Sequence, residues 1–312
     1  MTEKRLTGQM EAWTLDQLAK SVFFHHKLHE WKLLELADQI DRVRGENLDW
    51  RDLNITEQAW DKVIHRGIKP VVVFAHPYVL QTIPGSAAYY RMLALVSQKS
   101  MKRVGLNLDS YEAGNPIVDK EMAMAVARHL NRIVSALIEA DDEIDVREFS
   151  LWRGMAAGSQ AQGSWQNTKG ASAEKAIREV ILQRLQRRFS IGVRQISSAK
   201  IDLGDGRVLI FADEPDIAIL RDNMPLVAVE IKGGIDQAGV LERIGAAIKS
   251  LRRTRQENPN SVTVLIVPDV AMTERAWEDL RINTETVTHL YSLQAILQDE
   301  REREAFFQIL LL

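Results

Sequence analysis

Two acidic residues and a lysine, at the ends of neighbouring apolar segments, form the pattern in this sequence that could do chemistry. Asp216 opens one segment, and Glu230 and Lys232 close the next. In a strand, successive side chains point to opposite faces, so Glu230 and Lys232 are expected to share a face with Leu226 and Ala228. An acid and a lysine on such an apolar face are costly to bury unless they are paired or bound to a metal ion.

The turn between the two segments predicts that the acidic side chains converge. Residues 221–225 are mainly polar and end in proline, which is typical of a turn that joins two strands of a hairpin. Directly opposed residues of paired strands lie ~5 Å apart. We therefore expect Asp216 and Glu230 to approach one point.

Two carboxylates and a lysine at one point suit the hydrolysis of a phosphodiester with Mg²⁺, for which Mn²⁺ is an expected substitute. Mg²⁺ prefers hard oxygen ligands, keeps several waters and takes the rest of its shell from phosphate oxygen. The ion polarises the phosphate and lowers the pKa of a bound water. Lys232 can orient that water, stabilise the charge that grows on the phosphate, or do both.

The second half of the chain has the elements that must position this hairpin. Apolar spacing predicts helices over 172–188, 236–255 and 273–281 and at the C-terminus, and strands over 191–203, 207–212, 215–220, 226–232, 262–267 and 286–291. This order of helices and strands predicts an α/β domain with a mixed central sheet flanked by helices.

The first half of the chain is predicted to be mainly helical. Helical spacing covers 14–46, 86–103 and 117–140, and the short apolar run 70–75 is predicted to be one buried strand. Residues 155–170 are small and polar without a period, which is typical of a linker. We therefore predict a helical region over 1–155, for DNA recognition or dimerisation, and a catalytic core over 156–312.

Composition narrows the class of protein. The 312 residues include no cysteine, which excludes a disulfide scaffold, a thiolate zinc site and a cysteine nucleophile. The N-terminus has no apolar signal region and no run approaches the ~18 apolar residues of a membrane span, so a cytoplasmic protein without a membrane partner is expected.

The net charge of −3 is weak evidence against a nucleic-acid partner, because charges of each sign gather in separate segments. Residues 139–148 are acidic, whereas residues 175–200 contain seven basic residues and one acid. Most such basic residues are ordinary solvated helix faces, but phosphate contacts need only some of them.

A family resemblance rests on the residues that could do chemistry. Pro215-Asp216 followed by Glu230-Ile231-Lys232 resembles the PD-(D/E)XK nuclease signature, and the predicted order of elements is similar to the core of that superfamily. The resemblance implies that Asp216 and Glu230 bind metal and that Lys232 is the catalytic lysine. It also implies a third acid on the first core helix, where Glu174 fits. The alternative for Glu174 is an acid favoured by the helix dipole.

A narrower resemblance points to type II restriction endonucleases of the XcyI group. It is carried by residues 213–219, 229–236 and 241–247, and upstream residues 88–94 and 97–99 resemble a segment shared by several restriction enzymes. The group implies a homodimer that cuts both strands of double-stranded DNA at a six-base palindrome of G and C, similar to CCCGGG. A DNA methyltransferase gene is then an expected neighbour.

Base contacts to a target of G and C favour arginine and lysine, since these side chains pair with guanine. On this ground Arg91, Gln98, Lys99 and Arg243 are candidate DNA-binding residues. Two alternatives stay open, namely a structure-specific repair or recombination nuclease with the same core and a non-catalytic DNA-binding module. Serine-hydrolase, P-loop and Rossmann motifs are absent from the sequence.

Overall fold

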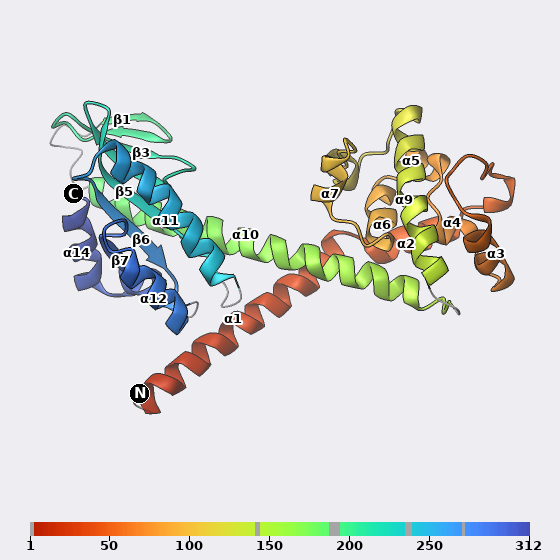
Figure 1. Cartoon of the computed structure of the whole chain (residues 1–312), viewed down its shortest axis with the longest axis horizontal. Coiled ribbons are helices and arrows are strands. Elements are labelled where there is room, and N and C mark those ends of the chain that lie inside the picture. The colour runs from red at the N-terminus through yellow and green to blue at the C-terminus, as the bar shows by residue number, and fades with distance from the viewer. Residues whose placement is uncertain (1–2, 141–143, 187–193, 235–238, 270–271) are drawn as a thin grey trace. The chain divides into compact units, whose positions relative to one another are not determined.

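The computed structural model divides the chain into two compact units (Figure 1). It describes residues 3–140, 144–186, 194–234, 239–269 and 272–312, with side chains from residue 14 onward. Residues 18–163 form one unit, called here the helical unit; residues 1–17 and 164–312 form the other, called the sheet unit. Parts of the acidic run (141–143) and of the basic run (187–193) lie outside the described residues.

Two long helices contribute to both units. Helix α1 covers Glu3–Glu30 and helix α10 covers Glu148–Gln186. The predicted domain boundary at residue 155 falls inside α10, and the division by contacts falls between residues 163 and 164. Among the described residues, no helix combines the length and the apolar character needed to cross a membrane.

The helical unit is built around α9. Its helices are α2 (Leu33–Asp41), α3 (Glu57–His65), α4 (Pro70–Val73), α5 (Pro77–Thr82), α6 (Ser86–Leu93), α7 (Gln98–Arg103), α8 (Asp109–Glu112) and α9 (Lys120–Ala140), with a short 3₁₀ helix at Gly45–Asn47. The buried side chains of α9 recur at helical spacing and include Ala123, Val126, Ala127, Leu130, Val134 and Ile138. The mainly helical character predicted for this half of the chain is confirmed.

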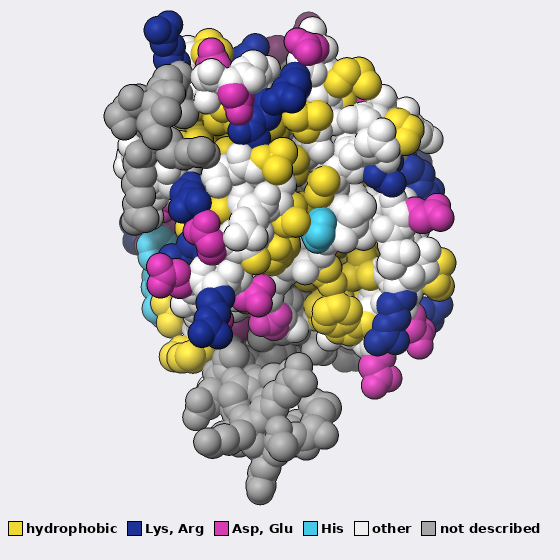
Figure 2. Space-filling view, turned by 90° about the vertical axis from the view of Figure 1, so that its left-hand side faces the viewer, with side chains coloured by type: hydrophobic (Ala, Val, Ile, Leu, Met, Phe, Trp, Pro, Cys, Tyr) yellow, Lys and Arg dark blue, Asp and Glu magenta, His cyan; other side chains and the backbone are white. Residues whose placement is uncertain are grey.

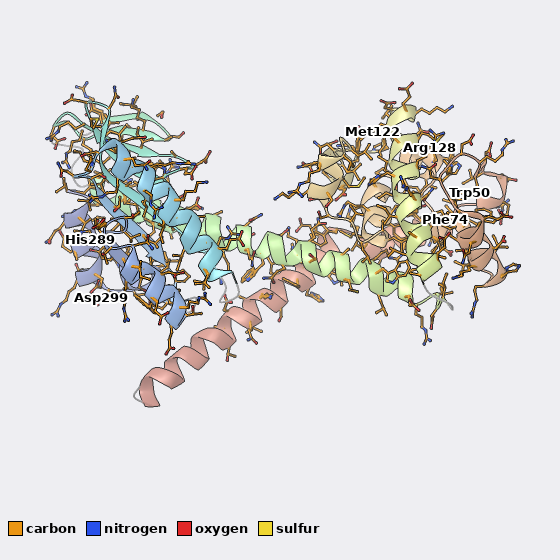
Figure 3. All side chains as sticks on the ribbon, in the orientation of Figure 1. Trp50, Phe74, Met122, Arg128, His289 and Asp299 are labelled. Carbon is orange, nitrogen blue, oxygen red and sulfur yellow. The ribbon has the colours of Figure 1, made fainter. Side chains whose placement is uncertain are left out.

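Three aromatic side chains, Trp50, Trp60 and Phe74, pack together in this unit. The ring centroid of Trp60 lies 5.6 Å from that of Trp50 and 6.1 Å from that of Phe74. Figure 3 labels Trp50 and Phe74, together with Met122 and Arg128 of α9. The Nε of Arg128 donates to the carbonyl of Asp52 at 2.6 Å and so fixes the loop before α3.

The prediction of a strand over residues 70–75 is wrong, because this run begins with the one-turn helix α4. Pro70 stands in the first turn, where its fixed φ suits a helix and its missing N–H costs no hydrogen bond. Val71, Val73 and Phe74 are all buried. A short run that is apolar on every side has no period by which strand and helix could be told apart.

The prediction of a linker over residues 155–170 is also wrong, because this stretch lies within α10. The close packing in this region belongs to the two glycines that follow β5, Gly233 and Gly234, which lie against α10. A Cβ atom on Gly233 would lie 2.1 Å from the Cβ of Ala173, and one on Gly234 would lie 2.2 Å from the carbonyl oxygen of Gln166. The chain that leaves the hairpin of residues 217–231 therefore crosses α10 at a distance that only glycine allows.

The sheet unit contains a seven-stranded mixed sheet in sequential order. The strands are β1 (Arg194–Ser197), β2 (Lys200–Asp202), β3 (Arg207–Phe211), β4 (Ile217–Arg221), β5 (Met224–Ile231), β6 (Val262–Val267) and β7 (His289–Ser292). Strands β1 to β5 pair antiparallel, whereas β5, β6 and β7 pair parallel. Helix α11 (Val240–Glu257) connects β5 to β6, and α12 (Glu274–Ile282) connects β6 to β7.

Helices cover both faces of this sheet, which confirms the predicted α/β class. One face packs on α10 and on the C-terminal helices α13 (Leu293–Gln298) and α14 (Glu300–Ile309). The other face packs on α11 and α12. On the face drawn in Figure 2, basic and acidic side chains are both interspersed among apolar ones.

The alternation predicted along β5 holds except at one residue. Val227, Val229 and Ile231 pack on the α10 side, and Ala228 packs on the α11 side. Leu226 was expected with Ala228 but packs on the α10 side. The reason is a bulge: Ile219 pairs with Val227 and Leu220 with Pro225, so Leu226 has no partner in β4.

Candidate active site

The hairpin of β4 and β5 brings Asp216 and Glu230 together. Ile217 pairs with Val229, and this antiparallel register places the residue before Ile217 beside the residue after Val229. The Oδ2 atom of Asp216 accepts a hydrogen bond of 2.6 Å from the backbone N–H of Ile231. Asp216 is 9% exposed and Glu230 2% exposed. Two carboxylates are thus held at the end of the hairpin, almost out of contact with solvent.

Lys232 completes this group from the end of β5. Its Nζ atom lies 3.6 Å from Oδ2 of Asp216 and donates a hydrogen bond to Oε2 of Glu230. The backbone N–H of Lys232 donates to the carbonyl of Ile266 at 2.9 Å, which continues the pairing of β5 with β6. The Lys232 side chain is 21% exposed, so it is the most exposed side chain of the three.

Ser250 is a member of the cluster that the sequence reasoning missed. It lies on the buried face of α11 between Ala247 and Leu251, and its Oγ donates a hydrogen bond to Oε1 of Glu230. Each oxygen of the Glu230 carboxylate therefore has its own donor. The signal was present in the sequence, because Ser250 and Thr254 are the two hydroxyl residues in a helical stripe that is otherwise apolar.

Glu174 approaches the cluster from α10. It follows Ala173, against which the backbone of Gly233 packs, and it precedes the buried Ile177 by one helical turn. Partial burial raises the pKa of Glu174, the nearby Lys232 opposes this shift, and the Asp213 and Glu230 carboxylates add to it. Glu174 therefore lies close enough for the charges of Lys232 and Glu230 to shift its pKa, although no hydrogen bond joins it to the three residues.

The two carboxylates and the lysine do not balance in charge. Burial raises the pKa of Asp216 to about 7, Lys232 and the Ile231 N–H oppose the shift, and Glu230 and Glu174 add to it. Burial alone would lower the pKa of Lys232, but Asp216 and Glu230 outweigh burial and raise it. One ammonium group is thus the partner of two carboxyl groups in a poorly solvated environment. This arrangement favours the binding of a cation beside the carboxyl groups.

The donor set fits a hard divalent cation. Asp216 and Glu230 offer carboxylate oxygens, and Mg²⁺ commonly takes one or two carboxylates and fills its remaining positions with water and substrate phosphate. In the described part of the chain, no group of three or more His, Asp or Glu side chains lies close enough to hold a metal ion by itself. The fit is therefore to a site that substrate and water complete.

The four predicted DNA-binding residues lie in different environments. In the helical unit, Arg91 is 1% exposed and its guanidinium pairs with Glu112, while Gln98 donates to the same carboxylate at 2.6 Å. Lys99, on α7 of that unit, is exposed. Arg243, on α11 of the sheet unit, is also exposed. A buried, paired guanidinium has no surface to offer a base edge, so burial disfavours the contact predicted for Arg91.

Comparison with known proteins assigns the chain to a group. The family model for the XcyI restriction endonuclease matches residues 27–311. The type II restriction enzyme Cfr9I of Citrobacter freundii is 29% identical over 206 residues, which cover 61% of this chain and 62% of that protein. The type II restriction enzyme XcyI of Xanthomonas campestris pv. cyanopsidis is 31% identical over 209 residues, or 61% of each. The chain thus spans less than two thirds of the length of these relatives.

Proposed function

We propose that this chain, which belongs to the XcyI restriction endonuclease family, is a Mg²⁺-dependent type II site-specific endonuclease that hydrolyses phosphodiester bonds of double-stranded DNA. The observation that carries the proposal is the buried cluster of Asp216, Glu230 and Lys232, which lies at the end of paired strands and is deficient in positive charge. Both relatives bear the name of type II restriction enzymes.

The proposed chemistry divides among the residues of the cluster. Asp216 and Glu230 would hold Mg²⁺, with Glu174 as a third, more distant acid. When bound, the ion supplies Lewis acidity to the scissile phosphate and acidity to a coordinated water. The Nζ of Lys232, whose side chain is the most exposed of the three, would stabilise the charge that grows on the phosphate oxygens and orient the water. Ser250 and the Ile231 N–H would keep the two carboxylates in place.

The cut of both strands favours a homodimer. The described residues of the chain hold one cluster of this kind, and each cluster attacks one phosphodiester at a time. Two copies related by a two-fold axis would present two equivalent clusters to the two strands of a palindrome. A six-base site of G and C, similar to CCCGGG, is the target that the resemblance to the XcyI group suggests. A cytoplasmic location, beside a methyltransferase that protects the host DNA, would suit this role.

Plasmid cleavage tests the proposal. The wild-type protein should convert plasmid DNA to defined linear fragments with Mg²⁺ or Mn²⁺, lose this activity in EDTA and regain it when the metal is restored. Asp216→Ala should abolish cutting, whereas Glu278→Ala, which removes an exposed acid of α12, should not. Undiminished cutting by Asp216→Ala would refute the site assignment.

The same experiment separates restriction from the other nuclease function. Discrete fragments from a long natural DNA, followed by sequencing of their ends, would give the recognition sequence and the cut position. Cutting that is confined to junctions or flaps would instead identify a structure-specific repair nuclease. Metal binding without hydrolysis of any DNA would identify a non-catalytic module.

A further inference from the structure

Helices α6, α7 and α8 form a small module in the helical unit whose turns are closed by specific hydrogen bonds. The Oγ of Ser97 caps α7 by accepting from the N–H of Ser100 at 3.1 Å. At the other end, Gly105 has a φ of +82°, its N–H donates to Lys102, and the next N–H, of Leu106, donates to Met101. This pattern of a left-handed glycine with nested bonds stops a helix sharply.

The chain enters α8 almost at once. The Oδ1 of Asn107 accepts from the N–H of Asp109 at 3.1 Å, and the carbonyl of Leu108 accepts from Glu112 at 2.9 Å. Only a few residues around Gly105 therefore separate the two helices. A short turn that contains glycine also joins the helices of a helix–turn–helix, but α8 has a single turn (Asp109–Glu112), so the comparison extends to the turn alone.

A buried ion pair fixes the geometry of the module. The Nε of Arg91, on α6, donates to Oε1 of Glu112, on α8, and its second guanidinium nitrogen donates to Oε2 of the same residue at 3.0 Å. The remaining nitrogen donates to the carbonyl of Val96 at 2.6 Å. Gln98 of α7 donates to Oε2 as well, and Gln160 of α10 accepts from Arg91 at 2.6 Å. This network ties the three helices of the module to one another.

Apolar side chains complete the inner side. Met101 of α7 and Leu108, at the start of α8, are 0% and 1% exposed and belong to the main core of the helical unit. With Met101 turned inward, the neighbouring positions of α7 turn outward. The outer side carries the positive charges of Lys99, Lys102 and Arg103, all of which are exposed.

The outer side also carries uncharged polar groups. Asn107, in the turn, and Ser110, on α8, are exposed, and the amide nitrogen of Asn107 is not used by its bond to Asp109. Lys102 pairs with Asp109 across the turn, which leaves the outer side with a positive balance from Lys99 and Arg103. Amide and hydroxyl groups between cations match the chemistry of a base edge between phosphates.

We propose that the outer side of α7, the turn at Gly105 and the one-turn helix α8 form a surface that docks on double-stranded DNA. Lys99 and Arg103 contact phosphates, whereas Asn107 and Ser110 face base edges in the major groove. Arg91 and Glu112 are positioning residues that hold α8 against α6. This inference rests on the proposed function for its ligand, and it assigns Arg91 a different role from the base contact predicted from the sequence.

Two double variants separate the two kinds of contact. Lys99→Ala/Arg103→Ala should weaken binding to specific and random duplex alike and should reduce the slope of log affinity against log salt by about 2, because each lost phosphate contact removes about 1. Asn107→Ala/Ser110→Ala should lower affinity for the specific duplex about 5-fold to 100-fold and leave random duplex unchanged. Lys120→Ala/Arg132→Ala, two exposed residues of α9, is the matched control.

Fluorescence anisotropy in EDTA measures these affinities on the full chain without cleavage, with the specific duplex taken from the sequenced ends of wild-type digests. Thermal unfolding of each variant checks that the module is intact. The inference is overturned if wild type cuts at a defined site while both test variants bind as the control does. If wild type does not cut, the proposed function has failed, and unchanged binding of Lys99→Ala/Arg103→Ala to random duplex would still overturn the docking surface.

Discussion

The two units each bury a group of opposite charges, and the groups differ in balance. In the helical unit one guanidinium, of Arg91, meets one carboxylate, of Glu112, and each nitrogen of the guanidinium has an acceptor. In the sheet unit one ammonium, of Lys232, meets two carboxylates, and the pKa of Asp216 rises to about 7 as a result of burial. The first group is complete and holds helices together; the second is incomplete and is suited to receive a cation and a substrate.

The largest effect is expected from breaking the balanced pair. Arg91→Ala should lower the free energy of unfolding by about 3–5 kcal/mol, because it leaves the Glu112 carboxylate buried without its partner. The double variant Arg91→Met/Glu112→Met should recover most of this loss, since apolar side chains of similar volume replace both charges. Urea denaturation measures both. A single variant as stable as wild type would show that the pair is not structural.

Breaking the unbalanced group should affect activity instead. Lys232→Ala should lower the single-turnover rate of DNA cleavage about 10²-fold to 10³-fold, since it removes charge stabilisation at the reacting phosphate. Lys120→Ala, at an exposed position of α9, should cut as wild type does. If Lys232→Ala retained the wild-type rate, the lysine would have no part in the chemistry.

The charge deficit should also be visible in stability. Because the folded-state pKa of Asp216 is raised from 3.8 to about 7, its contribution to stability is present at low pH and is lost as pH rises through 7. In EDTA, Asp216→Asn should therefore become more stable than wild type as pH rises from about 5 to about 8. Mg²⁺ at 100 times its Kd should restore about 2.7 kcal/mol to wild type and nothing to the variant. Parallel pH curves for the two proteins would contradict a charge deficit at this site.

A smaller effect on cleavage is expected from Ser250, which donates a hydrogen bond to Glu230. Ser250→Ala should weaken Mg²⁺ binding or cleavage about 10-fold to 100-fold, because Oε1 of Glu230 loses the donor that orients it. Ser250→Thr keeps the hydroxyl and should restore most of the activity. Titration of cleavage against Mg²⁺ distinguishes this positioning role, which raises the metal requirement, from a general loss of folded protein, which does not.

The smallest effect concerns a neutral side chain in the helical unit. His76 caps α5 because its Nδ1 accepts from the N–H of Tyr78 at 3.1 Å, and burial lowers its pKa below 6.5. The stabilisation is therefore present above pH 6.5 and is lost as pH falls through that value towards the lower folded-state pKa. Protonation of His76 should lower the free energy of unfolding by about 1 kcal/mol, which is typical of the loss of a helix cap. His76→Asn should abolish this pH dependence, because asparagine caps a helix without titrating. Unfolding at a series of pH values checks this.

The convergence of Asp216, Glu230 and Lys232 was predicted better than the elements around them, for physical reasons. Strand alternation placed Glu230 and Lys232 on the face of Ala228 because a period of two is a strict geometric rule. It failed at Leu226, where the bulge depends on how β4 and the turn pair, which no local pattern reveals. The linker predicted over residues 155–170 was wrong because glycines and small polar residues without a period are typical of a loop, whereas this stretch lies inside the long helix α10.

The contacts of the two buried charged groups join residues from different elements. In the sheet unit, Ser250 of α11 donates to Glu230 of β5. In the helical unit, Arg91 of α6 donates to Glu112 of α8 across two turns of the chain. Whether a polar residue faces a partner or solvent depends on tertiary packing, and a single sequence gives only its type. Arg91 shows the difference, because the same residue type serves base contacts when exposed and helix packing when buried.

The crossing of Gly233 and Gly234 over α10 has a consequence for how this protein tolerates mutation. Any side chain at either position must displace the helix or the end of β5, and Lys232 is the adjacent residue. A random screen for loss of cleavage would thus return both glycines beside the acids and the lysine, although neither has a functional group. If the proposed function holds, the region in which substitutions abolish cleavage is wider than the set of reacting side chains, because it includes two positions where the backbone can carry no side chain.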